Sequence, residues 1–361
     1  MRAKLSVEAD IRQASTLPSW FYTDPAAFDE VRERVFARSW QLVADTDLVK
    51  SPGQVCPVTL LDGLLEEPLV LTRAADDSLH CLSNVCTHRA NLVVEGPSVE
   101  SGLRCRYHGR RFDLDGRFQS MPEFETTRDF PSPDDDLRRL DVAPWGKLLF
   151  ASLDPAFPLG ELLAPMQERC GWLPLHQAVL DPARSRDYLV RAHWALYCEN
   201  YLEGFHIPYV HAGLSQGLDY AAYRTELHRY SSVQVGVARG GEHVFELPAS
   251  SPDHGAAVAG YYFWLFPNLM LNFYPWGISV NVVKPLGPDR TRVSFLSYVW
   301  DPSRLDRGAG ADLDRVERED EAVVESVQKG MASRLYRRGR YSPTREQGVH
   351  HFHRLLAERL D

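Results

Sequence analysis

Two short segments of the chain each pair a cysteine with a histidine: Cys86 with His88, and Cys105 with His108. Two thiolates and two imidazoles are the ligands of a [2Fe–2S] centre in which histidines replace cysteines on one iron. A neutral imidazole removes negative charge relative to a thiolate, so the reduction potential rises, to roughly −150 to +300 mV. The four residues therefore predict a centre that accepts and passes on single electrons.

A structural zinc site takes the same four ligands and is the alternative. Zinc sites usually place roughly two or more residues between paired ligands, whereas one residue separates Cys86 from His88. Gly109 and a turn sequence over residues 113–116 follow the second pair. Loops of this kind bring backbone N–H groups towards sulfur, which tunes iron–sulfur clusters. These features favour the iron–sulfur cluster.

A second pair of candidate ligands is His206 and His211, five residues apart. On a continuous helix this spacing turns the side chains roughly 140° apart, so they converge only if the helix breaks. Pro208 lies between them, and proline breaks helices. Two convergent histidines can provide two ligands of the 2-His-1-carboxylate site of non-haem Fe(II) oxygenases. Two unrelated, partly buried histidines are the alternative.

The third ligand must be a carboxylate, and the predicted amphipathic helix over residues 312–336 contains several. Asp320 falls on the apolar stripe of this helix, whereas the neighbouring glutamates fall on its polar flanks. The stripe consists of Leu313, Val316, Val323, Val324, Val327, Met331 and Leu335. A lone carboxylate on a buried face costs about several kcal/mol unless it is paired or binds a metal. We therefore predict Asp320 as the third iron ligand, with a buried ion pair as the alternative.

The pattern of predicted elements divides the chain of 361 residues into an α+β arrangement. Residues 1–44 are expected to form an N-terminal helical segment, helical over 26–44, that packs on the domain formed by residues 156–361. Residues 45–155 alternate strand-like runs with turns, which predicts an all-β domain with both Cys/His pairs on loops. Residues 156–361 are mixed, with helices predicted at 194–206, 312–336 and 346–360 and strands between 227 and 300.

Composition limits the classes of partner. A net charge of −9 argues against nucleic acid or an anionic membrane. The N-terminal residues contain no apolar signal-peptide core, so a cytoplasmic location is expected. The apolar run 258–276 is interrupted at Pro267 and is interpreted as two strands, not a membrane span. The other four cysteines show no paired spacing and are expected to be free buried thiols.

Together the motifs 86–109, 199–211 and 319–330, in this order, resemble the catalytic (α) subunits of Rieske non-haem iron oxygenases. The resemblance implies an all-β Rieske [2Fe–2S] domain and a helix-grip (Bet v 1-like, START-like) catalytic domain, whose antiparallel sheet surrounds a long C-terminal helix. It also implies O2 activation at a mononuclear Fe(II), with electrons from NAD(P)H through a separate reductase. Such subunits usually form homotrimers, in which the cluster of one subunit serves the iron of its neighbour.

In this family a carboxylate bridges a cluster histidine and an iron histidine, and by position Glu203 is that catalytic residue, with His108 and His206 as partners. Most members have Asp there; Glu resembles the branch that acts on choline, carnitine and betaines, as do residues 328–330 and 348–353. The chain departs from the usual motif at Arg110 and Arg111, where Trp is common, and at His193, where Asn is common. These departures concern the substrate and the reductase, not the metal ligands.

Aromatic residues are dense over 261–276 and are interpreted either as sheet core or as a pocket wall. Aromatic faces attract a quaternary ammonium, and we expect Trp264 and Phe273 to line the substrate pocket. The expected protein is a terminal oxygenase that hydroxylates or N-demethylates a small quaternary ammonium compound. The alternatives are a hydroxylase of an aromatic or other C–H substrate, and an electron-transfer protein with the cluster alone.

Overall fold

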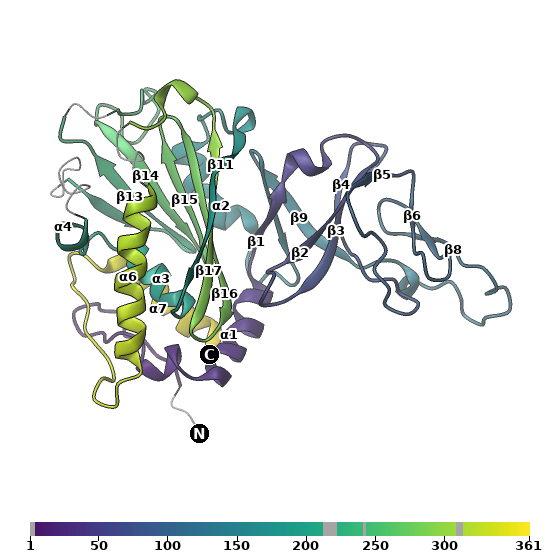
Figure 1. The fold of residues 1–361 in the computed structure, drawn as a ribbon, viewed down its shortest axis with the longest axis horizontal. Helices are drawn as coiled ribbons and strands as arrows, with labels where there is room; N and C mark the ends of the chain where they lie inside the picture. Colours follow the sequence, from purple (N-terminus) through teal and green to yellow (C-terminus); the bar gives the residue numbers. More distant parts are fainter. Residues whose placement is uncertain (1–3, 212–221, 241–242, 308–312) are drawn as a thin grey trace. The chain divides into compact units, whose positions relative to one another are not determined.

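The computed structural model describes residues 4–211, 222–240, 243–307 and 313–361. The chain folds into two units, shown in Figure 1. The small unit is Ala37–Ala156, and the large unit combines Met1–Phe36 with Phe157–Asp361. The large unit is thus discontinuous in sequence.

Strands form the small unit, as expected for residues 45–155. A seven-stranded sheet has the order β1-β10-β9-β4-β3-β2-β5, and a three-stranded sheet has the order β6-β7-β8. Apolar side chains from both faces of the pleat form two buried clusters, one of which includes Cys86 and Cys105. The strands are β1 (Gln41–Asp45), β2 (Gln54–Leu60), β3 (Glu67–Arg73), β4 (Leu79–Ser83), β5 (Ser98–Val99), β6 (Leu103–Arg104), β7 (Arg111–Phe112), β8 (Phe118–Ser120), β9 (Arg139–Trp145) and β10 (Leu148–Ser152), with short 3-10 turns η3 (Thr46–Val49) and η4 (Pro133–Asp135).

The second half of the predicted helix over 26–44 was wrong, and so was the domain boundary at residue 44. Helix α1 (Pro25–Arg34) begins where expected, and Asp24 accepts a hydrogen bond from the N–H of Ala26 at 2.9 Å. A 3-10 turn, η2 (Phe36–Arg38), follows, and β1 then pairs antiparallel with β10. Residues 41–44 therefore belong to the sheet of the small unit, where β10 provides their backbone hydrogen-bond partners. The apolar periodicity of the sequence does not reveal such a distant partner.

A seven-stranded antiparallel sheet, with the order β11-β17-β16-β15-β14-β13-β12, is the centre of the large unit. Pro267 lies in the hairpin between β14 and β15, so the two-strand interpretation of residues 258–276 is confirmed. No helix within the described ranges is long and apolar enough to cross a membrane. The strands are β11 (Val179–Val190), β12 (Arg224–Leu227), β13 (Ser231–Val237), β14 (Val258–Leu265), β15 (Leu269–Tyr274), β16 (Gly277–Gly287) and β17 (Arg290–Val299).

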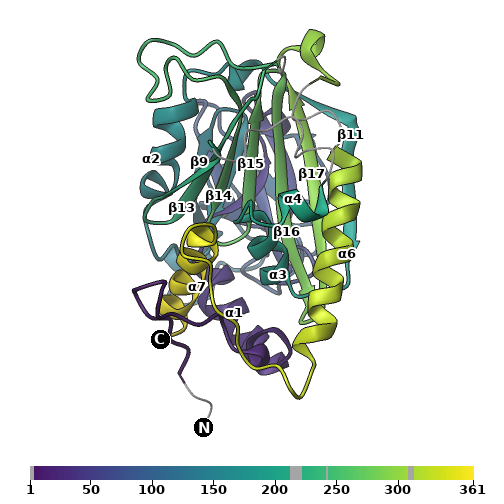
Figure 2. The ribbon, with the colours of Figure 1, turned by 90° about the vertical axis from the view of Figure 1, so that its left-hand side faces the viewer.

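Helices cover both faces of this sheet. On one face, Trp264 of β14 contacts Phe352 of α7, which also contacts Trp194 of α3. Figure 2 shows α3, α4 and α6 over that face, which is the expected helix-grip arrangement. On the other face, the guanidinium of Arg169 in α2 lies 5.8 Å from the ring centroid of Tyr261. The helices are η1 (Ser19–Tyr22), α2 (Leu159–Cys170), η5 (Leu175–Gln177), α3 (Trp194–Tyr201), α4 (Ile207–Val210), η6 (Pro302–Arg304), α6 (Leu313–Met331) and α7 (Gln347–Leu360).

The N-terminal residues of the large unit pair with a segment near its C-terminus. The N–H of Ser19 donates to the carbonyl of Arg337 at 2.9 Å, and the N–H of Thr16 to that of Gly339 at 3.1 Å. The first 36 residues are therefore an integral part of the large unit.

His193 connects the N-terminal segment to α3. Its side chain is fully buried, and Nδ1 accepts a hydrogen bond from the N–H of Ala195 at 3.3 Å, which caps α3. Rings of Phe21, Tyr22 and Phe28 lie 5.3, 5.5 and 6.1 Å from the imidazole, centroid to centroid. Burial among these rings lowers the pKa of His193 to about 3. The folded protein therefore holds this histidine neutral.

This burial predicts a loss of stability in weak acid. Below the ordinary histidine pKa of about 6.5, the unfolded chain binds a proton at His193 that the folded protein does not bind. Stability is therefore lost as pH falls from about 6.5 towards 3. We expect His193→Asn, which keeps a capping side chain, to reduce this pH dependence. Urea unfolding at several pH values measures it, with the exposed His176→Asn as control, and identical pH dependence in His193→Asn and the parent would contradict the prediction.

Candidate functional site

The four predicted cluster ligands lie on two loops of the small unit. In the loop after β4, the N–H of Cys86 donates a hydrogen bond to the carbonyl of Asn91 at 2.9 Å. In the loop between β6 and β7, the N–H of Cys105 donates to the carbonyl of Arg110, also at 2.9 Å. Both thiols are buried, whereas the imidazole of His108 is exposed and its ring centroid lies 4.7 Å from that of His88. This donor set suits a two-iron cluster that exchanges electrons through its histidine side.

Arg110, which departs from the usual motif, is buried against the second loop. Its guanidinium forms an ion pair with Asp135 and lies over the rings of Phe118 and Phe130, at 4.9 and 5.5 Å from their centroids. The side chain therefore joins the loop of Cys105 to residues 130–135.

The cluster assignment predicts the result of exchanging one histidine for cysteine. We expect His108→Cys to keep a [2Fe–2S] centre but to lower its reduction potential by roughly 100 mV or more, because thiolate adds negative charge. Redox titration followed by visible absorbance measures the shift. Tyr107→Phe, at the adjacent exposed position, is the control, and an unchanged potential in His108→Cys would remove His108 from the ligand set.

His206 and His211 lie at the two ends of α4, with ring centroids 5.1 Å apart. They converge, but the expected role of Pro208 was wrong. Pro208 lies in the first turn of α4, where its missing N–H costs nothing. The break lies between α3 and α4, over residues 202–206, and His211 ends the short helix with a non-helical backbone.

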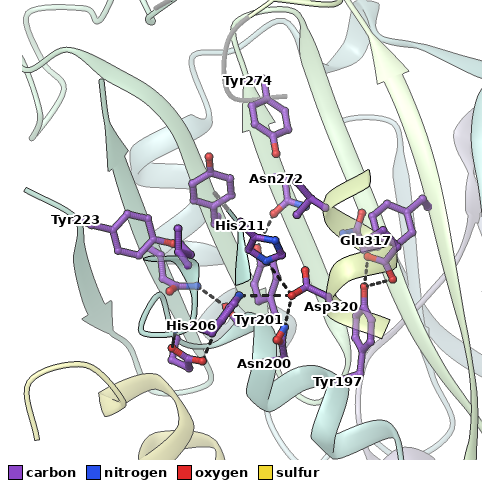
Figure 3. Close-up of a pocket in the computed structure, with 17 residues that line it drawn as sticks. Tyr197, Asn200, Tyr201, His206, His211, Tyr223, Asn272, Tyr274, Glu317 and Asp320 are labelled. Carbon is purple, nitrogen blue, oxygen red and sulfur yellow. Dashed lines mark hydrogen bonds and ion pairs between the residues drawn. The ribbon is translucent and has the colours of Figure 1, made fainter. Parts of the chain in front are cut away.

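Asp320 meets both histidines from α6 (Figure 3). Its Oδ1 lies 3.0 Å from Nε2 of His211 and 3.5 Å from Nε2 of His206. One ligand atom from each residue lies within 4.8 Å of the other two. Two imidazoles and one carboxylate at this spacing fit a single non-haem Fe(II), which this donor set is known to bind with coordination positions left open.

Outer partners orient the three donors. Nδ1–H of His206 donates to Glu203 and that of His211 to Glu319, each at 2.7 Å, so both Nε2 atoms face Asp320. The amide of Asn200 donates to Oδ1 of Asp320 at 2.7 Å. Hydrogen bonds from ligand histidines to carboxylates are typical of metal sites, because they hold the tautomer and the ring orientation.

The buried face of α6 differs from the predicted apolar stripe. Asp320 lies on it, but Val323 and Val327 are exposed, and Leu335 lies beyond the helix and is exposed as well. The inward residues include Glu317 and Val324, which are buried. The face is partly polar because it borders a metal site and a pocket, where burial does not require an apolar side chain.

Beside the three donors is a cavity of about 130 Å³. Trp264 and Phe273 were predicted to border the pocket, and this was wrong: Phe273 is on the opposite face of the sheet, and Trp264 is covered by α7. Pairing of Tyr262 with Asn272 places Tyr262 and Tyr274 on the pocket face instead. The lining residues are Tyr197, Asn200, Tyr201, Glu203, His206, Ile207, His211, Tyr223, Gln234, Tyr262, Asn272, Tyr274, Asn281, Phe295, Val316, Glu317 and Asp320.

Residues 172–361 match the family of ring hydroxylating alpha subunits (catalytic domain), and residues 39–131 match the Rieske [2Fe-2S] domain. The chain therefore belongs to the catalytic α subunits of Rieske non-haem iron oxygenases and is an oxidoreductase. These two domains imply a [2Fe–2S] cluster and an iron.

Relatives of the chain within this family include choline and carnitine monooxygenases. It is 33% identical to the chloroplastic choline monooxygenase of Arabidopsis thaliana, over 99% of this chain and 87% of the relative. It is 30% identical to the carnitine monooxygenase oxygenase subunit of Escherichia coli (strain K12), over 97% and 95%. The fold matches that of the quaternary ammonium Rieske monooxygenase CntA in complex with L-carnitine, with a TM-score of 0.78, 23% identity and full coverage of both chains.

Proposed function

We propose that the protein is a terminal oxygenase that hydroxylates or N-demethylates a small quaternary ammonium compound. The observation that carries this proposal is the position of His206, His211 and Asp320 in the wall of an aromatic pocket. Relatives at 33% and 30% identity are named as choline and carnitine monooxygenases, which supports the same substrate class.

In this proposal the three donors hold Fe(II), and Cys86, Cys105, His88 and His108 hold the cluster. When bound, the iron and the cluster provide O2 activation and single-electron transfer. One oxygen atom enters a C–H bond of the substrate, and the other leaves as water with two electrons and two protons. Glu203 and Glu319 keep the ligand histidines in one tautomer and orientation, and Asn200 holds the carboxylate of Asp320.

The pocket walls provide the binding chemistry for an ammonium group. Five tyrosines and Phe295 are among the lining residues, and the pKa values of several of these hydroxyls are raised well above the ordinary value by burial, so the rings stay neutral. A cation against such ring faces gains about 0.5–2 kcal/mol per contact.

Electron supply and assembly complete the proposal. Glu203 is proposed to link His206 to His108 of a neighbouring subunit in a homotrimer, and a separate reductase to deliver electrons from NAD(P)H. Inter-subunit electron transfer in a quaternary ammonium Rieske monooxygenase of similar fold supports the transfer between subunits. A cytoplasmic location stays a prediction.

Two measurements test the proposed function. The purified protein should contain about three irons per chain, whereas an electron carrier with the cluster alone contains about two. With a competent reductase, choline, carnitine and betaines should stimulate O2 uptake, and formaldehyde should appear wherever the reaction is N-demethylation. Aromatic acids are the control panel. Uptake with aromatic acids and none with ammonium compounds would replace this proposal with an aromatic hydroxylase.

A further inference from the structure

A second acidic side chain of α6, Glu317, borders the pocket one helical turn before Asp320 (Figure 3). The residue is only 4% exposed, and its two oxygens lie 2.8 and 2.6 Å from the hydroxyl of Tyr197, on α3. It belongs neither to the three-donor group nor to the outer partners of the ligand histidines.

The hydrogen bonding of Glu317 is incomplete for an ionised carboxylate. Tyr197 provides one proton, whereas a carboxylate accepts at about four lone-pair sites. No Lys, Arg or His in the described ranges forms an ion pair with Glu317. Burial raises the pKa of Glu317 to about 8, and the negative charge of Asp320 adds to this rise. Without a cation beside it, the side chain therefore mostly holds its proton at neutral pH, and a ligand cation at this position would favour the ionised carboxylate.

The two histidines in the described lining of the pocket face Asp320, and no other basic side chain there could pair with a negatively charged group. This described lining contains no Lys or Arg. Two other carboxylates line the pocket, and both have partners: Glu203 holds His206, and Asp320 faces the two histidines. Among the described lining residues, Glu317 is therefore the carboxyl group that no basic side chain faces.

We propose that Glu317 recognises the ammonium group of the substrate, and that the pocket therefore selects ammonium compounds without a carboxylate, such as choline, over ammonium carboxylates. This inference rests on the proposed function. Side chains three residues apart on a helix are about 5–6 Å apart, so an ammonium at Glu317 has its carbon substituents next to Asp320. A ligand carboxylate would bring a negative charge next to Glu317, and it would find no Lys or Arg among the described lining residues.

The first test needs no variant. Calorimetric titration of the anaerobic, metal-loaded protein compares choline with glycine betaine and with 3,3-dimethyl-1-butanol, the neutral carbon analogue of choline. We expect choline to bind at least about 10-fold more tightly than either, a difference of about 1.4 kcal/mol in binding free energy. Glycine betaine bound as tightly as choline would overturn the proposed selection.

The second test removes the charge and keeps the shape. Glu317→Gln still accepts a hydrogen bond from Tyr197, so its affinity for choline should fall about 10-fold while that for the neutral alcohol changes by less than about 3-fold. Glu317→Asp keeps the charge and should keep the preference for choline. Glu321→Gln, on the same helix but outside the pocket lining, is the control and should match the parent.

The outcomes separate this inference from the proposed function. If the parent binds choline and Glu317→Gln keeps the full preference over the neutral alcohol, the inference fails and the function stands. If the parent binds no ammonium compound, both fail. Cluster absorbance and iron content at the parent level show that a variant is folded. If Glu317→Gln does not fold, Glu317→Asp provides the test, and loss of its preference for choline over the neutral alcohol would overturn the proposal.

Discussion

Asp320→Ala should lose the mononuclear iron and nearly all turnover, while the absorbance of the [2Fe–2S] cluster stays at the parent level. The variant removes the one charged donor of the three, leaving two neutral imidazoles. We expect turnover to fall by more than the roughly 10–100-fold that loss of an outer-shell partner causes. Iron should fall from about three to about two per chain, because the cluster residues lie in the other unit.

Two neighbours on α6 provide graded controls. Glu319→Gln weakens the support of His211, so we expect an intermediate loss, about 10–100-fold in iron affinity or activity. Glu321→Ala has no contact with the donors and should resemble the parent. Full iron and turnover in Asp320→Ala, with loss of both in Glu319→Ala, would show that Glu319 and not Asp320 is the third iron ligand.

Glu203→Gln should leave the metal content of the protein unchanged but slow the transfer of electrons from the cluster to the iron. The carboxylate of Glu203 accepts hydrogen bonds from the ring of His206 at 2.7 Å and from its backbone N–H at 3.1 Å. The amide can accept at one oxygen only and has no charge, so it holds His206 less firmly and weakens the proposed link to His108 of the neighbour. We expect all three irons to remain and the cluster to be reduced normally. Reoxidation of the cluster after mixing with O2 and substrate should slow by about 10–100-fold.

Stopped-flow absorbance of the cluster and product yield in a single turnover measure this effect. Glu168→Gln, an exposed position on α2, is the control for loss of one negative charge. A normal product yield at the normal rate in Glu203→Gln would exclude Glu203 from electron transfer.

Most of the site residues were predicted from short motifs in which the functional side chains are close together in the sequence. The spacing of the two Cys/His pairs and of His206 and His211 indicated which side chains converge, because each pair lies within a few residues on one loop or at one short helix. Asp320 was predicted from its position on an apolar stripe, but this stripe is only partly buried. Val323 and Val327 are exposed, whereas Glu317 is buried. Hydrophobic periodicity identifies the inward face of a helix reliably only where that face meets an apolar core.

The pocket could not be read from the sequence. Dense aromatic residues over 261–276 do not show which rings face α6, because this depends on the register of β14 with β15 and on where α7 covers the sheet. Trp264 and Phe273 were wrong for these reasons. The partners of Glu317 and Glu319 lie more than 100 positions away along the chain, at Tyr197 and His211, so no local signal indicates them.

The discontinuous large unit has a consequence for synthesis of the protein. Residues 14–19 pair with residues 337–340, so the earlier segment can pair only after more than 300 further residues have been synthesised. The small unit is continuous over Ala37–Ala156 and contains all four cluster ligands. Domains generally fold as units during translation. The small unit can therefore fold and take up its cluster on the nascent chain before α6 is synthesised, whereas the iron site of the large unit needs Asp320 of α6 and forms later.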